Sequence, residues 1–79
     1  MNIIFDGYTI GLFWRRVLVH YEGSFYIISE NTAVGETMIF LATPTGEVID
    51  WLGAGGGDPD LTADEVLKDF SRYLDLTSR

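Results

Sequence analysis

This 79-residue chain has no cysteine, a single histidine and only five lysines and arginines. The lack of cysteine excludes a disulfide framework, a thiolate zinc site and a cysteine nucleophile. With His20 as the one imidazole, a metal site built from several histidines is excluded too. The longest apolar runs are about five residues, against the roughly 20 that cross a bilayer. The N-terminus also lacks the basic and apolar regions of a signal peptide, so we expect a cytoplasmic protein without a membrane segment.

Most of the charged residues are acidic. Aspartate and glutamate number 12, which gives a formal net charge of −7. No lysine or arginine occurs between Val17 and Leu67, and we expect this acidic stretch to repel nucleic-acid phosphates and to attract a basic protein surface. Solubility alone is the alternative explanation. The acids of the stretch are Glu22, Glu30, Glu36, Glu47, Asp50, Asp58, Asp60, Asp64 and Glu65.

The apolar content predicts a folded domain and not an acidic disordered tail. Hydrophobic residues make up 47% of the chain and aromatic residues 14%, with a mean hydropathy of +0.15. No repeat, low-complexity tract or linker divides the sequence. We therefore interpret residues 1–79 as one domain, with a sheet over about 2–52, a glycine-rich connector over 53–61 and a helix over about 62–76.

The first half of the chain predicts strands. A short strand over 2–5 is followed by Asp6-Gly7, a common two-residue hairpin turn, and then by a long strand over 8–21. Glu22-Gly23 predicts a tight turn into a strand over 25–29. Alternation along the long strand places Val17 and Val19 on one face with Arg15, and Leu18 on the other face with Arg16. We expect one arginine to pair with an acid across the sheet and the other to be available to an interface.

A second hairpin is predicted over 37–43 and 47–52. Pro44-Thr45-Gly46 suits the turn between these strands, because proline favours the second position of a type I turn and glycine the fourth. Neither face of the return strand is cleanly polar. We expect Trp14 and Trp51 to be buried in the core, and the alternative is an exposed apolar patch for a partner or a second copy.

The C-terminal segment predicts one helix. Thr62 and Glu65 have the spacing of a capping box, and Asp64 with Lys68 and Asp69 with Arg72 have the spacing of helical ion pairs. The fold class is therefore α+β: a small antiparallel sheet of four or five strands with one C-terminal helix packed on one face. The apolar stripe of the helix consists of Ala63, Val66, Leu67, Phe70, Tyr73 and Leu74.

The motifs that could carry chemistry are incomplete. Residues 53–57 are glycine-rich, but acids and not Gly-Lys-Ser/Thr follow them, so no phosphate loop is expected. Asp58-Pro59-Asp60 begins like a calcium loop, yet Ala63 and Asp69 stand where that loop needs Gly and Glu. His20, beside Trp14 and Leu18, is expected to be a strand-surface or half-buried residue and not the base of a Ser24 or Ser29 nucleophile. No cleft is predicted around Asp58 and Asp60. We expect no enzymatic activity, no cofactor and no metal site.

In size, acidity and sheet-plus-helix plan, the chain resembles the small anti-CRISPR proteins of phages. The stretches 36–40 (ETMIF) and 46–51 (GEVIDW) are similar to an "ETMxF…GxVxDW" pattern in short phage and proteobacterial accessory proteins. The resemblance to anti-CRISPR proteins implies an inhibitor that binds a type I CRISPR surveillance (Cascade) complex in the infected host's cytoplasm. Its acids would then occupy the basic groove that holds target DNA.

The partner is therefore predicted to be a basic nucleic-acid-binding protein or ribonucleoprotein complex, and a monomer is expected. Two alternatives stay open: a homodimeric accessory or structural protein, and an antitoxin-like neutraliser of a basic protein. The predicted partner-binding residues are Glu22, Glu30, Glu36, Glu47, Asp50, Asp58 and Asp60, with Trp14 and Trp51 as aromatic contacts.

Overall fold

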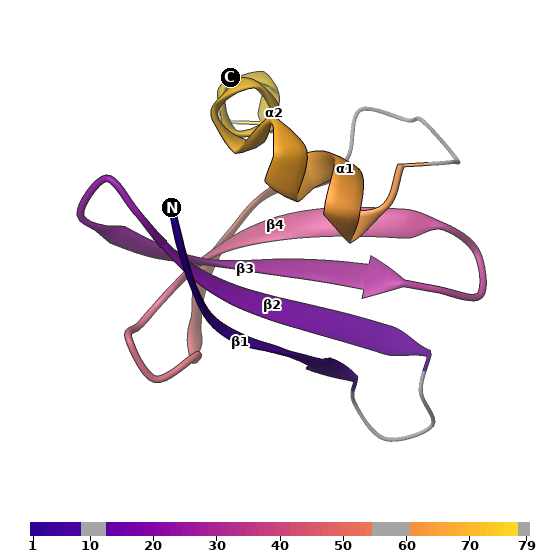
Figure 1. The fold of residues 1–79 in the computed structure, drawn as a ribbon, viewed down its shortest axis with the longest axis horizontal. Helices are drawn as coiled ribbons and strands as arrows, with labels where there is room; N and C mark the ends of the chain where they lie inside the picture. The colour runs from indigo at the N-terminus through magenta and orange to yellow at the C-terminus, as the bar shows by residue number, and fades with distance from the viewer. Residues whose placement is uncertain (9–12, 55–60, 78–79) are drawn as a thin grey trace.

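A computed structural model describes residues 1–8, 13–54 and 61–77, and it contains a five-stranded antiparallel sheet followed by two short helices (Figure 1). The strands follow one another across the sheet in the order β1-β2-β3-β4-β5. The predicted α+β class and the predicted sheet are confirmed. The elements are β1 (Asn2–Tyr8), β2 (Trp14–Tyr21), β3 (Ser24–Asn31), β4 (Glu36–Ala42), β5 (Val48–Ala54), α1 (Ala63–Lys68) and α2 (Phe70–Thr77).

The turns of the sheet lie where the backbone can take positive φ. Glu22 and Gly23 have φ values of 48° and 82°, the combination that a two-residue turn needs to match the twist of its strands. Gly35 and Gly46 have φ values of 71° and 89° in the turns after β3 and β4. The predicted turns at 22–23 and 44–46 are therefore confirmed.

The predicted turn at Asp6-Gly7 is wrong. Strand β1 continues through both residues to Tyr8, and β2 begins only at Trp14, so residues 8–21 do not form one long strand. Gly7 serves a different purpose here. A Cβ atom at this position would lie 2.9 Å from the Phe5 ring, so the missing side chain makes room for that ring. The sequence also predicts a bend of that long strand at Gly11, and this residue lies outside the described residues.

Both helices lie on the same side of the sheet and cover one of its faces (Figure 1). The main core forms between this helix-covered face and the helices. Val17 and Val19 of β2 point into it, as their alternation with Leu18 predicted. The buried residues of this core are Val17, Val19, Ile28, Ile39, Leu61, Ala63, Val66 and Phe70.

The C-terminal segment forms two helices and not the single one that its apolar stripe predicts. Asp69 separates them with φ −139° and ψ 52°, values outside the helical region, and its N–H donates to the Val66 carbonyl at 3.3 Å. Beyond this break Phe70 is buried in the core, and its ring lies edge-on to Tyr21 and Tyr26 at centroid distances of 5.2 and 5.3 Å.

The other face of the sheet, which we call the open face, carries no helix among the described residues (Figure 1). A second, smaller cluster of Leu18, Ile27 and Ala42 is buried there beneath Phe25 and Phe40. Trp51, opposite Phe40 in the register, is 57% exposed, so the prediction that it is buried in the core is wrong. The open face consists of Trp14, Arg16, Leu18 and His20 of β2, Phe25, Ile27 and Ser29 of β3, and Met38, Phe40 and Ala42 of β4.

Candidate functional site

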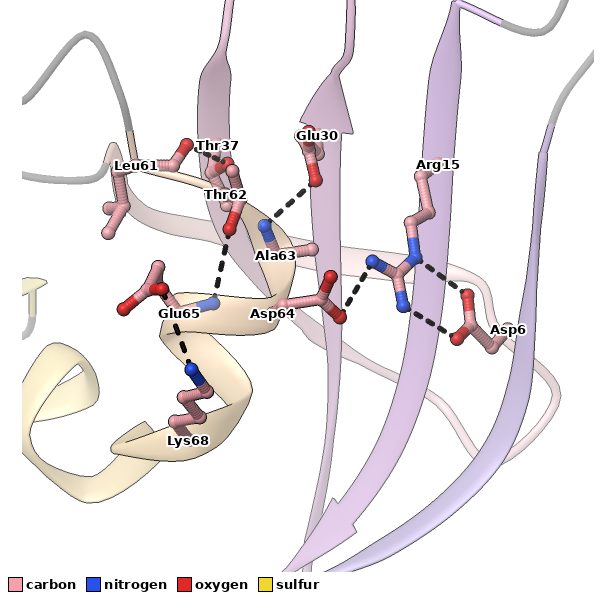
Figure 2. A network of polar contacts seen from close by, with 10 residues as sticks. All are labelled: Asp6, Arg15, Glu30, Thr37, Leu61, Thr62, Ala63, Asp64, Glu65 and Lys68. Carbon is pink, nitrogen blue, oxygen red and sulfur yellow. Dashed lines mark hydrogen bonds and ion pairs between the residues drawn. The ribbon is translucent and has the colours of Figure 1, made fainter.

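The arginines of β2 point to opposite faces of the sheet and have different surroundings. On the helix-covered side, the Arg15 guanidinium lies between Asp6 of β1 and Asp64 of α1 (Figure 2). Its Nε and Nη2 atoms donate to the two Asp6 carboxylate oxygens at 2.9 and 2.8 Å, and its Nη1 donates to Asp64 at 2.9 Å. The predicted pairing of one arginine with an acid across the sheet is confirmed, and it ties α1 to β1 and β2.

These contacts change the titration of both partners. The hydrogen bonds from Arg15 lower the pKa of Asp6 below its ordinary value, because they favour the charged carboxylate. The same bonds to Asp6, helped by the one to Asp64, raise the pKa of Arg15 further above its ordinary value. Arg15 is therefore a structural cation whose charge is already neutralised within the molecule.

The start of α1 is held by polar groups that sequence analysis had assigned only in part (Figure 2). The Thr62 hydroxyl accepts the Glu65 N–H at 3.2 Å, which confirms Thr62 as the N-cap. Thr37 of β4 donates its hydroxyl proton to the Leu61 carbonyl at 2.8 Å. Lys68 lies 3.7 Å from Glu65 and not beside Asp64 as predicted, because Asp64 binds Arg15 instead.

Glu30 is buried and therefore does not belong to the candidate binding surface. It is 8% exposed on β3, behind α1, and its Oε1 accepts the backbone N–H of Ala63 at 2.9 Å. This carboxylate therefore satisfies the first amide of the helix and presents no charge to a partner. Asp58 and Asp60, two further predicted contacts, lie outside the described residues.

The remaining predicted acids are exposed but do not form one cluster. Glu22 lies in the β2–β3 turn, and Glu47 and Asp50 lie at and just after the β4–β5 turn. The strand register brings these two turns to the same end of the sheet, since Phe25 pairs with Ala42 and Ala42 with Val48. We call Glu22, Glu47 and Asp50 the acidic end. Glu36 lies at the opposite end, where β4 begins.

Most positive charge in the described part of the chain is already paired. Besides Arg15, Arg72 lies 3.9 Å from Asp69, the pair predicted for the helix, and Lys68 lies beside Glu65. By contrast, within residues 1–8, 13–54 and 61–77 no ion pair involves a carboxylate of the acidic end. Among the described side chains at this end of the sheet, the unpaired charge is therefore negative.

Arg16 borders two hollows that the described residues form on the open face. One, of about 440 Å³, lies between β1, β2, β3 and the β4–β5 turn. The other, of about 340 Å³, is lined by Trp14, Ser29, Met38 and Phe40. Sequence analysis had singled out Trp14 and Arg16 but not the hollows, because their walls come from strands and a turn that only the register brings together.

His20, the single histidine of the sequence, lies on β2. The His20 ring stacks on Phe25 at a centroid distance of 4.6 Å, on the surface of the strand as its neighbours predicted. No group of three or more His, Asp or Glu side chains in these ranges could hold a metal ion. Within the same ranges, neither helix has the length and apolar character that crossing a membrane requires.

No protein-family model, curated protein or solved structure matches this chain.

Proposed function

We propose that this chain is a non-enzymatic binding protein that engages a basic surface on another protein through its acidic end. The observation that carries the proposal is the separation of charge: Arg15 is neutralised between two carboxylates, whereas Glu22, Glu47 and Asp50 are exposed and unpaired among the described residues. Unpaired surface charge of one sign steers association with a surface of the opposite sign and excludes partners of like charge.

The natural partner of such a surface is a groove that binds nucleic acid, because lysines and arginines gather there to neutralise phosphates. In this proposal, the chain competes with the nucleic acid for that groove. Together with the resemblance to anti-CRISPR proteins, this leads to the specific form of the proposal: inhibition of DNA binding by a type I CRISPR surveillance complex. Glu36 is a peripheral contact in this account, since it lies at the other end of the sheet.

The experiment is a competition assay with a purified type I surveillance complex and a fluorescently labelled target duplex. The proposal expects the protein to displace the duplex in a dose-dependent way at low salt and to lose this effect as salt rises, because exposed charges are screened over about 10 Å at 0.1 M. Failure to displace the duplex at any salt concentration would refute the specific form. Displacement that is independent of salt would refute the electrostatic mechanism.

The broader proposal, that the acidic end binds a basic surface, is tested separately by passing the protein over immobilised basic nucleic-acid-binding proteins. An immobilised acidic protein of similar size is the control. Retention that falls with salt is expected. If the protein is not retained by any basic partner, its acidity serves solubility, and the binding proposal fails as a whole.

A second candidate function, homodimerisation, is favoured by the exposed apolar residues around the open face. Phe5 and Trp51 are each 57% exposed, and Val48 is also exposed at the sheet edge. A stable dimer buries about 800 Å² on each partner. Size-exclusion chromatography with light scattering distinguishes the candidates: a mass of twice 8.9 kDa would support the dimer, and a single mass the binding of another protein.

A further inference from the structure

The hollow of about 440 Å³ on the open face has the dimensions of a small-molecule site. Its floor is formed by Leu18 and Ile27, both almost fully buried, and β1 contributes Ile4 and Phe5 as one wall. The β4–β5 turn, residues 44–46, closes the opposite side. The volume of about 440 Å³ lies within the range of about 300 to 1,000 Å³ that is usual for ligand pockets.

The turn is placed to form a wall of this hollow. Gly46 has a φ of 89°, which directs its backbone against β2: a Cβ atom built at this position would lie 3.7 Å from the Leu18 Cδ2. The hollow is therefore bounded by parts of the chain more than 20 residues apart in sequence, and it is a product of the fold and not of one loop.

Among the described residues, Arg16 supplies the one charged side chain in the lining of this hollow. It is half-buried, and within the described residues its guanidinium forms no hydrogen bond and no ion pair. The contrast with Arg15 is sharp, because that neighbouring residue donates three hydrogen bonds to two carboxylates. Partial removal of an unpaired cation from water is unfavourable, and an anion bound beside it would offset this cost.

We propose that this hollow binds a small monocarboxylate with an apolar body. The carboxylate contacts the Arg16 guanidinium, whose planar fork matches two carboxylate oxygens, and the hydrocarbon lies on Leu18 and Ile27 beside the Phe5 ring. The inference does not depend on the proposed function, since the acidic end and this hollow use different residues.

Charge favours a carboxylate over a phosphate ester. The chain has a net charge of −7, and no second cation lines the hollow among the described residues. A dianionic phosphate would therefore be repelled about twice as strongly as a monoanion while gaining only one arginine. Size fits a small molecule, because the floor, β1 and the turn bound a hollow of about 440 Å³.

The test is a titration of the ¹⁵N-labelled protein with octanoate, followed by NMR, and in parallel with octanol, which has the same chain length and no charge. We expect saturable shifts of the Leu18 and Ile27 amides and of the Arg16 Nε–H. Octanol should bind at least about tenfold more weakly, in line with the loss of a charge-assisted hydrogen bond.

The matched variants are Arg16→Met and Arg72→Met, which change the net charge equally. Arg16→Met keeps an apolar side chain in the hollow and should weaken octanoate binding at least about tenfold. Arg72→Met, on the far side of the sheet, should leave it unchanged. Should Arg16→Met fail to fold, Arg16→Lys provides the second variant, and it should bind octanoate more weakly than wild type because an ammonium lacks the bidentate geometry.

The proposal would be overturned by equal affinities for octanoate and octanol, by an equal loss of octanoate affinity in the Arg16 and Arg72 variants, or by the absence of any saturable shift. Shifts confined to Trp14, Met38 and Phe40 would also overturn it, since they would place the ligand in the smaller hollow on the other side of Arg16.

Discussion

The Glu30 carboxylate accepts the backbone N–H of Ala63 at 2.9 Å and so joins the middle strand of the sheet to the first residue of α1. An isolated helix of six residues is not stable in water, because its few hydrogen bonds do not offset the unfavourable free energy of nucleation. This contact, together with the Thr62 cap and the Arg15–Asp64 pair, holds α1 where Val66 can enter the core. Glu30 is thus part of the fold.

Replacing Glu30 by alanine should destabilise the protein by about 1 to 3 kcal/mol, because the buried Ala63 N–H would lose its acceptor. Glu30→Gln keeps a carbonyl oxygen at this position and should recover most of the loss. Urea unfolding followed by far-UV circular dichroism measures both. Equal stability of the alanine variant and wild type would show that the amide finds another partner and that the carboxylate is dispensable.

Asp6 should make the stability of the protein depend on pH. Its folded-state pKa is lowered by the Arg15 hydrogen bonds, so its contribution is complete above the ordinary value of 3.8 and is lost as pH falls through the lower folded-state pKa. The side chain is 38% exposed, so this contribution is below about 1 kcal/mol.

Asp6→Asn should therefore lower the stability of the protein at pH 7. It should also reduce the further loss of stability as pH falls below about 4, the ordinary Asp pKa. The control is Asp50→Asn, which removes the same charge from a carboxylate without an ion pair among the described residues. Urea midpoints at neutral and acid pH test the prediction. Parallel pH profiles for the two variants would contradict it.

Trp51 and Ile28 should differ strongly in their effect on stability. Trp51 is exposed on the edge strand, and its replacement by alanine should cost less than about 0.5 kcal/mol. Ile28 is fully buried in the main core, where replacement by alanine should cost about 2 to 5 kcal/mol. Thermal unfolding of both variants measures the difference, and a large loss for Trp51→Ala would mean that its indole packs more closely than its exposure indicates.

Local patterns predicted much of the fold. The turns at 22–23 and 44–46, the alternation around Val17 and the Thr62 cap each depend on neighbours in sequence, and the structure confirms them. The turn at Asp6-Gly7 and the unbroken helix were wrong. Gly7 accommodates a ring from its own strand, and Asp69 breaks the helix where Phe70 turns toward Tyr21 and Tyr26. The position of Phe70 is decided by strands far from it in sequence, which a local pattern does not include.

The candidate surfaces, like the fold, could be predicted from the sequence only in part. The acidity that led to the predicted contacts is visible in the sequence, but the burial of Glu30 behind α1 is not, because it depends on a helix 33 residues away. Likewise, Arg15 and Arg16 are adjacent and chemically alike. Only the register shows that one is paired with Asp6 and Asp64 while the other borders two hollows.

The central claim is that the acidic end, and not net charge, recognises a basic partner. It is tested most directly by two triple variants that each change the net charge from −7 to −4. One is Glu22→Gln, Glu47→Gln and Asp50→Asn at the acidic end. The other is Glu65→Gln, Asp69→Asn and Asp75→Asn, in and between the two helices.

Both triples are compared with wild type for displacement of target DNA from the purified type I surveillance complex at low salt, after circular dichroism has shown that each is folded. The account predicts that the acidic-end variant loses at least about tenfold in displacement, as expected for three charged contacts of about 0.5 to 1 kcal/mol each, while the helix variant retains it. Equal losses would contradict the account, and so would an acidic-end variant that displaces DNA as well as wild type does.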